Sequence, residues 1–509
     1  MLVKTYSAAL RGVDAITITV EVNLSKGAFY NLVGLPDSAI KEGYERIQAA
    51  FKNNEFKWPG RRVTVNLAPA DIRKEGSSYD VPIAIGVLAA AEAVSTEKLE
   101  DYMLIGELSL DGAIKPLKGV LPMAIQAKKE GFKGFIVPQA NAQEAAVVDD
   151  IDVIGVNDIG ELVDFLNNEL QIKPHQFVYE DQQALGVYMP DFAEVKGQLN
   201  IKRALEIAAA GGHNVLLIGP PGAGKTMLAK RMSTILPPLS KDEALETTKI
   251  HSVAGKLNGV GLMMQRPFRS PHHSISDVAL VGGGQYPQPG EISLAHNGVL
   301  FLDELPEFKR QVLEVMRQPM EDRMVSISRA KFSVDYPAGF MLVASMNPCP
   351  CGYFNHPEKE CSCGPGIVQR YLNKVSGPLL DRIDLHVEVT PVEFEDLNKK
   401  EPGEPSAAIR MRVMQARAIQ ANRFEQAKGL YCNAQMQASL LRKSCQIDKA
   451  GTALLKNAMD KLGLSARAYD RILKVSRTIA DLASSDKIEA EHLAEAIQYR
   501  SLDRESWEA

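Results

Sequence analysis

One octapeptide constrains this chain more than any other feature. Residues 219–226 read Gly-Pro-Pro-Gly-Ala-Gly-Lys-Thr and match the pattern G-x-x-x-x-G-K-[ST]. The apolar stretch Val215–Ile218 precedes them and a helical pattern, Met227–Leu236, follows, which is the strand–loop–helix context that the motif requires. Its glycines allow backbone N–H groups to turn around phosphate oxygens, and the start of the helix adds a favourable partial charge. The chain is therefore expected to contain an α/β domain that binds a nucleotide.

The eight residues have separate expected roles. Lys225 is expected to reach the β- and γ-phosphates, and Thr226 to ligate Mg²⁺. The backbone of the other six would surround the phosphates; these are Gly219, Pro220, Pro221, Gly222, Ala223 and Gly224. ATP and Mg²⁺ are the cofactors that this loop predicts.

Two further apolar strands are predicted to end beside the loop. Residues 299–302 are apolar and lead into Asp303 and Glu304, and ligands of open α/β sheets bind where the strands end. Asp303 is expected to hold Mg²⁺ through water, and Glu304 to polarise the attacking water as a general base. The strand 340–345 leads to Asn347, whose amide could orient that water, although an asparagine there is more often a turn residue.

Two arginines have open roles on spacing alone. Arg382 stands between carboxylates in the run 379–384, which a surface ion pair also explains. Arg467 comes just before the helical segment Ala468–Leu482, where a positive charge is unfavourable for the helix dipole. Arg471 follows four residues later, and either arginine therefore calls for a partner elsewhere.

Between the loop and the acidic strand, residues 266–293 are rich in glycine and proline, which favours defined loops. The adjacent His272 and His273 are interpreted as structural or DNA-proximal in preference to metal ligands. Further on, residues 324–327 and 332–336 predict a hairpin whose tip carries Arg329 and Lys331. Such a tip can bind phosphates without reading sequence; an exposed charged turn is the alternative.

Four of the six cysteines lie within residues 349–363: Cys349, Cys351, Cys361 and Cys363. Four thiolates suit a tetrahedral, structural Zn²⁺ site with no open position. The C-x-C spacing is tighter than usual, so reduced cysteines without metal remain the alternative. Cys432 and Cys445 are predicted to be core residues.

Composition sets outer limits on these interpretations. A length of 509 residues predicts three to four domains. A net charge of -5 gives no sign of nucleic-acid or membrane-surface binding, so a polyanion would have to meet local basic loops. No run of about 18 apolar residues occurs; the most apolar, Val81–Val94, contains Glu92 and predicts a buried helix. The first residues lack a signal-peptide pattern, so a cytoplasmic protein is expected.

Together these motifs resemble, along essentially the whole chain, the ComM/YifB family of magnesium-chelatase-like AAA+ ATPases. The segments that carry the resemblance are residues 219–226, 266–274, 290–305 and 347–352. The resemblance implies a hexameric ring with ATP between subunits, and an insert in helix 2 and a hairpin that both face the central pore. By motif, Asn347 resembles sensor 1, Arg382 the arginine finger offered to a neighbour's ATP, and Arg467 sensor 2. Arg329 and Lys331 fall on the pore hairpin.

The N-terminal part resembles a Lon-protease-like α+β domain of the ribosomal S5 domain 2-like type. Residues 74–80 and 106–112 carry this likeness. Active Lon-type proteases pair a serine with a lysine that acts as its general base. Ser78 stands where the serine is expected, but the lysine position falls on Met123, and a thioether cannot take a proton. The domain is therefore interpreted as non-proteolytic, with a role in assembly or DNA engagement.

The predicted architecture is thus an α/β multidomain chain. It comprises a Lon-like domain (1–168), a linker (169–190), an AAA+ P-loop core with a helix-2 insert (191–395) and a C-terminal helical lid (396–509). The family implies an ATP-driven helicase that promotes branch migration of transforming or recombining DNA. Its expected partners are single-stranded and branched DNA, further copies of itself and recombination proteins, and no membrane. A chelatase-type motor acting on a metal-insertion partner is the main alternative, and an ATP-dependent protease the third.

Overall fold

The computed structural model describes residues 1–178, 190–257, 259–284, 287–329, 332–356, 358–392, 403–427 and 429–500. Contacts divide the chain into two compact units. The first contains the described residues of 1–185, 241–264 and 328–336, and the second contains the rest. The domain boundaries given above stay a prediction.

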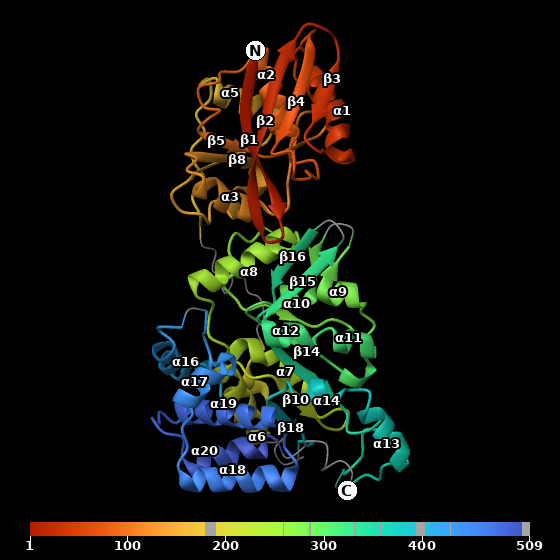
Figure 1. Ribbon diagram of the computed structural model, residues 1–509, viewed down its shortest axis with the longest axis vertical. Helices are drawn as coiled ribbons and strands as arrows, with labels where there is room; N and C mark the ends of the chain where they lie inside the picture. Colours follow the sequence, from red (N-terminus) through yellow and green to blue (C-terminus); the bar gives the residue numbers. More distant parts are fainter. Residues whose placement is uncertain are drawn as a thin grey trace. The chain divides into compact units, whose positions relative to one another are not determined.

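The first unit is built on a mixed seven-stranded sheet with the order β3-β4-β2-β1-β5-β8-β9 (Figure 1). Its long strands β1 and β2 pair antiparallel from Leu2↔Asn23 to Arg11↔Asp14. Residues 17–22 and 62–67, in which apolar and polar side chains alternate, lie in two of its strands. The bounds are β1 Leu2–Arg11, β2 Asp14–Ser25, β3 Tyr30–Val33, β4 Arg62–Ala68, β5 Tyr102–Leu104, β8 Gly134–Pro138 and β9 Asp152–Val156.

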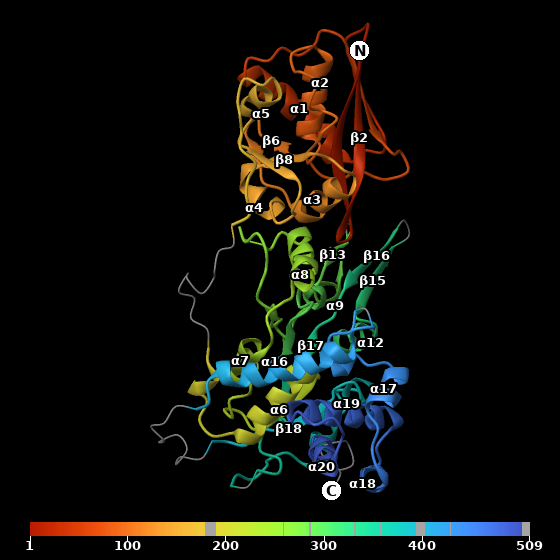
Figure 2. The same cartoon turned by 90° about the vertical axis from the view of Figure 1, so that its left-hand side faces the viewer.

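Helices cover both faces of this sheet, because its strands are apolar on both. On β8, Ile136 belongs to one core cluster, whereas its neighbours Phe135 and Val137 belong to the other, as expected when successive side chains point to opposite faces. The first cluster includes residues of α1 (Ser38–Asn53), α2 (Asp80–Ala90) and α5 (Ile159–Leu166), and the second those of α3 (Val120–Lys129) and α4 (Ala142–Ala145). Figure 2 shows α1, α2 and α5 grouped together. Every residue of α2 is buried, as its apolar run predicted.

One later helix belongs to this first unit. The helix α8 (Lys241–Val253) packs against α3, where Ser252 O accepts from Gly119 N at 3.0 Å. Near its middle, Lys249 Nζ lies 2.5 Å from Asp14 Oδ1. Leu245 of α8 accordingly packs against the core cluster that contains residues of α3.

The second unit contains a parallel five-stranded sheet with the order β11-β14-β17-β10-β18. Ile218 at the end of β10 is in register with Met346 of β17 and Glu388 of β18. The strands therefore end at one common edge. Their bounds are β10 Val215–Ile218, β11 Phe268–Arg269, β14 Val299–Leu302, β17 Met341–Met346 and β18 Leu385–Glu388.

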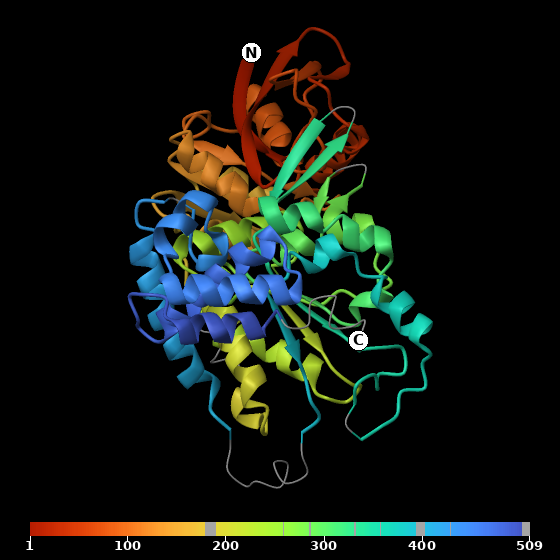
Figure 3. The same cartoon turned by 60° about the horizontal axis from the view of Figure 1, so that its bottom comes forward.

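Helices surround this sheet and make up the end of the chain. Within the core these are α6 Leu199–Gly211, α7 Lys225–Ile235, α9 Asp277–Val281, α10 Glu291–Leu294, α11 Arg310–Glu314, α12 Arg317–Asp322, α13 Pro365–Leu372 and α14 Gly377–Leu380. The C-terminal region is helical, as predicted, with α16 Ser406–Arg423, α17 Ala438–Ser444, α18 Lys449–Leu462, α19 Ala466–Leu482 and α20 Ala490–Gln498. These last helices gather in one cluster (Figure 3), and α6, α16 and α19 contribute to the same apolar core.

The predicted hairpin is present and is longer than expected. Its strands are β15 (Met324–Arg329) and β16 (Phe332–Pro337), and they form a two-stranded sheet. Among the described residues, no helix has both the length and the apolar character needed to span a membrane.

Candidate ATP site and cysteine cluster

The nucleotide loop joins a fully buried strand to a helix. All four residues of β10 are buried, and α7 begins at Lys225. Gly222 and Gly224 have φ angles of 82° and 87°, a region that glycine enters at no steric cost. The loop therefore turns sharply where the sequence motif supplies glycine, and it leaves backbone N–H groups at the N-terminus of α7.

Lys225 is held against this loop from two sides. Its Nζ donates to Gly219 O at 2.6 Å and to Pro220 O at 2.9 Å, and it lies 3.0 Å from Asn347 Oδ1. The residue is 9% exposed, and burial lowers the pKa of its amine. The amine thus lies between the loop and the residue predicted to orient water.

Asp303 is fixed by the hydroxyl groups of two neighbouring elements. Thr226 Oγ1 donates to its Oδ2 at 2.7 Å, and Ser345 Oγ donates to its Oδ1. Ser345 lies in β17, beside the strand that carries Asp303. Ser345 was not among the residues predicted to form the site, although its place near the end of a predicted strand was the available signal. Thr226 and Asp303 together offer the oxygen ligands that Mg²⁺ prefers.

Glu304 lies immediately beyond Asp303 in an unusual backbone conformation. Its φ and ψ are 55° and 51°, a left-handed conformation that costs a residue with a Cβ atom about 1–2 kcal/mol. Its Oε2 lies 3.7 Å from His273 Nδ1. His273 was predicted to be a structural or DNA-proximal residue of an insert, and its contact with Glu304 was not predicted.

Arg382 has partners within its own chain. Its Nη1 donates to Pro378 O at 2.6 Å, and its Nη2 lies 2.5 Å from Glu321 Oε1. The residue is 4% exposed, and its Nε has no hydrogen-bond partner among the described residues. The guanidinium is therefore engaged by Glu321 on α12 and by the start of α14.

The two arginines of α19 have different surroundings. Arg467 lies exposed in the first turn of the helix, which Ser465 caps by accepting from Ala468 N at 3.2 Å. Arg471, one turn later, pairs with the buried Asp384. Arg471 thus has a structural partner, and Arg467 remains on the surface of the helix.

The basic hairpin tip is described only in part. Arg329 is the last residue of β15, and Lys331 lies outside the described residues. Their role in DNA binding stays a prediction.

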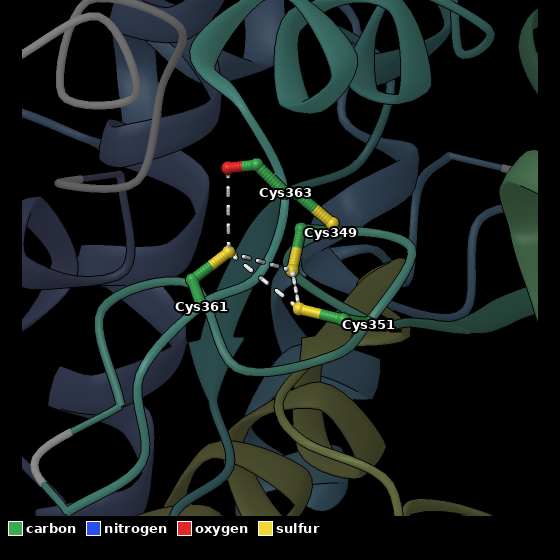
Figure 4. Close-up of side chains that lie close together, drawn as sticks. All are labelled: Cys349, Cys351, Cys361 and Cys363. Carbon is green, nitrogen blue, oxygen red and sulfur yellow. Dashed lines mark hydrogen bonds between the residues drawn. The ribbon is translucent and has the colours of Figure 1, made fainter.

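The four clustered cysteines converge (Figure 4). Their Sγ atoms all lie within 4.8 Å of one another. The Cys349–Cys351, Cys351–Cys361 and Cys349–Cys361 separations are 3.3, 3.5 and 3.7 Å. A tetrahedral site with bonds of about 2.3 Å places its sulfurs about 3.8 Å apart. The backbone N–H of Tyr353 is the main cause that lowers the pKa of Cys351 to about 5, whereas the pKa of the neighbouring Cys361 is raised to about 12; Cys351 is therefore the first of these thiols to ionise. Cys432 and Cys445 are buried elsewhere, as predicted.

Comparison with known sequences covers the whole chain. Family models described as magnesium chelatase, subunit ChlI, match residues 191–397 and 20–141, and the model of the ChlI C-terminal region matches residues 403–500. The competence protein ComM of Haemophilus influenzae is 44% identical over 503 residues, which covers 98% of this chain and 97% of ComM. The Escherichia coli protein YifB is 44% identical over 501 residues, with the same coverage.

The chain belongs to the ComM/YifB family of magnesium-chelatase-like AAA+ proteins. Membership implies ATPase activity with ATP and Mg²⁺ as cofactors. The group formed by Lys225, Thr226, Asp303 and Asn347 fits both, because it supplies one cation toward phosphate and oxygen ligands toward a metal.

The N-terminal part of this family member is similar to a protease domain. Lon protease 2 of Bacillus subtilis is 28% identical over 140 residues, which is 27% of this chain and 25% of that protein. Ser78 lies two residues before α2, and Met123 is packed in the core cluster that contains residues of α3. The absence of a serine–lysine pair stays a prediction, based on the thioether at position 123.

Proposed function

We propose that this protein is a hexameric, ATP-driven DNA motor that promotes branch migration while single strands are integrated into a duplex. The observation that carries the proposal is the contact of Lys225 with Asn347 beside the Thr226–Asp303 pair, because it joins the parts of a hydrolysis site. The name of the competence protein ComM, which is similar along its whole length, supports a role in DNA uptake and integration.

Hydrolysis follows from the chemistry of these side chains. Lys225 would leave the loop carbonyls to bind the β- and γ-phosphates. Glu304 accepts a proton from the attacking water, which Asn347 orients through its amide. Mg²⁺, when bound by Thr226 and Asp303, neutralises charge on the phosphate oxygens.

The ring is proposed because Arg382, the expected finger, is engaged by residues of its own chain that lie outside the nucleotide loop. Arg382 contacts Glu321 and Pro378, and Arg467 is exposed on α19. In a ring, Arg382 would serve the ATP of a neighbouring subunit and so make hydrolysis depend on assembly. Arg329 and Lys331 from each hairpin would line the pore. This local positive charge would allow DNA binding although the net charge of the chain is -5.

The test is movement of a DNA junction. Wild type and Glu304→Gln are purified, and ATP-dependent movement of three- and four-strand junctions is measured with short and long heteroduplexes. Wild type is expected to move the junction and Glu304→Gln to bind DNA without moving it. A wild type that binds DNA and hydrolyses ATP but never moves a junction would contradict the motor.

A chelatase-type motor is the second candidate, since the matching family models are those of ChlI. Measurements of ATP turnover distinguish the two motors. Single-stranded DNA should raise the turnover of a DNA motor, whereas a protein partner should raise that of a chelatase-type motor. A protease is the third, and peptidase activity that is lost in Ser78→Ala would revive it.

We also propose that the four cysteines bind a structural Zn²⁺. Their sulfur separations support four-coordinate binding, and four protein thiolates leave no position for substrate.

A further inference from the structure

His273 and Glu304 come from neighbouring segments at the same edge of the sheet. β11 runs parallel to β14, with Arg269 in register with Leu300. The segment after β11 carries His273, and the segment after β14 carries Glu304. Parallel strands end at the same edge, and the topology thus places the imidazole Nδ1 3.7 Å from Glu304 Oε2.

The segment that carries His273 is fixed at its base. Arg269 donates from Nε and Nη2 to the two carboxylate oxygens of Glu291, at 2.6 and 2.7 Å. A bidentate pair of this kind sets direction as well as distance. The chain therefore leaves β11 along a defined path toward Glu304.

Aromatic neighbours hold the imidazole itself. The ring of His272 lies 4.0 Å from that of His273, centroid to centroid, and Phe308 approaches edge-on at 6.4 Å. His272 Nδ1 is 2.8 Å from Ser274 Oγ, which fixes the outer ring of the pair. Phe308 follows Glu304 by four residues, so the imidazole contacts the acidic segment in two places.

The contact contributes little to the stability of the fold. The side chains of His273 and Glu304 are 37% and 57% exposed, and pairs this exposed add little free energy to folding. A general base has a different requirement, because catalysis is sensitive to displacements of about 0.5 Å. A glutamate that is more than half exposed has many rotamers, and a fixed partner reduces their number.

We propose that His273 is a positioning residue for Glu304: it holds the carboxylate where it can accept a proton from the attacking water. The inference rests on the proposed function, in which Glu304 is the base of ATP hydrolysis. It assigns a role to the insert histidine through its contact with the base and without a metal.

The test compares ATP turnover by His273→Ala and wild type in the absence of DNA. The expected result is a fall in kcat of about 10- to 100-fold, with KM for ATP, binding of a fluorescent ATP analogue and the melting temperature unchanged. His273→Gln, which places a polar amide near the carboxylate, should recover part of the rate. His175→Ala, a histidine of the first unit, should turn over like wild type.

A double-variant comparison separates positioning from a general structural role. In a Glu304→Asp background the shorter carboxylate is already out of reach, so His273→Ala should cost little more. The same fold loss in both backgrounds would overturn the inference, and so would a His273→Ala protein with wild-type kcat beside an inactive Glu304→Gln. Equal turnover by wild type and Glu304→Gln would instead overturn the proposed hydrolysis, and this inference with it.

Discussion

Lys225 Nζ lies 3.0 Å from the amide oxygen of Asn347, a residue 122 positions further along the chain. The contact follows from the sheet, because Ile218 and Met346 are in register at the ends of adjacent parallel strands. The residues that follow these two strands therefore lie at the same edge of the sheet. Because Asn347 contacts the lysine that is proposed to bind phosphate, the two side chains should act together in turnover.

Asn347→Ala is expected to lower kcat for ATP by about 100-fold and to leave ATP affinity nearly unchanged. The amide is placed to orient water, whereas the loop backbone and Lys225 supply most of the binding. Turnover and binding of a fluorescent ATP analogue measure the two effects separately. Asn373→Ala, an exposed asparagine at the end of α13, is the matched control. A variant that loses affinity and keeps kcat would show that Asn347 binds ATP and does not orient water.

Arg382 gives a test of the ring. Arg382→Ala and Lys225→Ala should each be inactive as single proteins, the first without a finger and the second without a phosphate ligand. Mixed together, they should regain part of the ATPase activity, because some interfaces then pair an intact loop with an intact arginine. Mixed samples that stay inactive, although light scattering shows rings that contain both variants, would contradict a role for Arg382 in a neighbour's site.

The sheet edge of the ATP site could be predicted from sequence because each part is local. A buried strand, a glycine loop and a helix follow one another without interruption, and two further strands end in Asp303 and near Asn347. The rule that ligands bind where parallel strands end joins these parts without knowledge of the loops between them. The buried helix α2 could be predicted because its apolar residues follow one another along the chain, so no distant partner is needed to identify it.

The partners of His273, Arg382 and Arg471 could not be predicted in this way. His273 reaches Glu304 through a loop whose path is set by the Arg269–Glu291 pair, and Arg382 meets Glu321 from a different helix. Such contacts depend on how irregular segments cross, which neither periodicity nor motif spacing encodes. For the same reason the packing of α8 against α3 could not be predicted, because the two helices lie far apart in the sequence.

Asp384 should be a main link between the C-terminal helices and the sheet. It is buried, it pairs with Arg471 of α19, and its Oδ2 accepts from Asn214 N at 2.9 Å. Burial alone would raise its pKa, but Arg471 and His213 outweigh burial and hold the pKa well below its usual range. Asp384→Asn is expected to cost about 3–5 kcal/mol at pH 7, because it leaves Arg471 without its counter-charge.

The stability that Asp384 contributes to the fold depends on pH. With a folded-state pKa below the unfolded value of about 4, Asp384 contributes its full stability above pH 4 and loses it as the pH falls below that value. The difference in free energy of unfolding between wild type and Asp384→Asn should therefore become smaller at acidic pH. Urea unfolding at pH 7 and near pH 3.5 measures it, with the exposed Asp470→Asn as control. A difference that stays constant with pH would contradict an ionised Asp384 in the folded state.

The cysteine cluster predicts one zinc ion per chain. Elemental analysis of protein purified without added metal should find it, and Cys351→Ser should lose it, because a hydroxyl is a poor ligand for Zn²⁺ at neutral pH. Cys432→Ser, at a cysteine outside the cluster, should keep the metal. If the Cys351→Ser and Cys361→Ser variants both retained zinc, a site formed by these thiols would be contradicted.

Gly352 should connect this cluster with the nucleotide loop. Its N–H donates to Cys349 Sγ at 3.2 Å, its φ is 85°, and a Cβ atom there would overlap Pro221 of the loop. Gly352→Ala is therefore strained in its backbone and displaces the loop, while all four thiols stay in place. ATP affinity should fall about 10-fold, in line with roughly 1.4 kcal/mol, and zinc content should stay the same. Gly366→Ala, where an added Cβ meets nothing within 4 Å, is the control. Unchanged ATP affinity in Gly352→Ala would show that the cluster and the loop act independently.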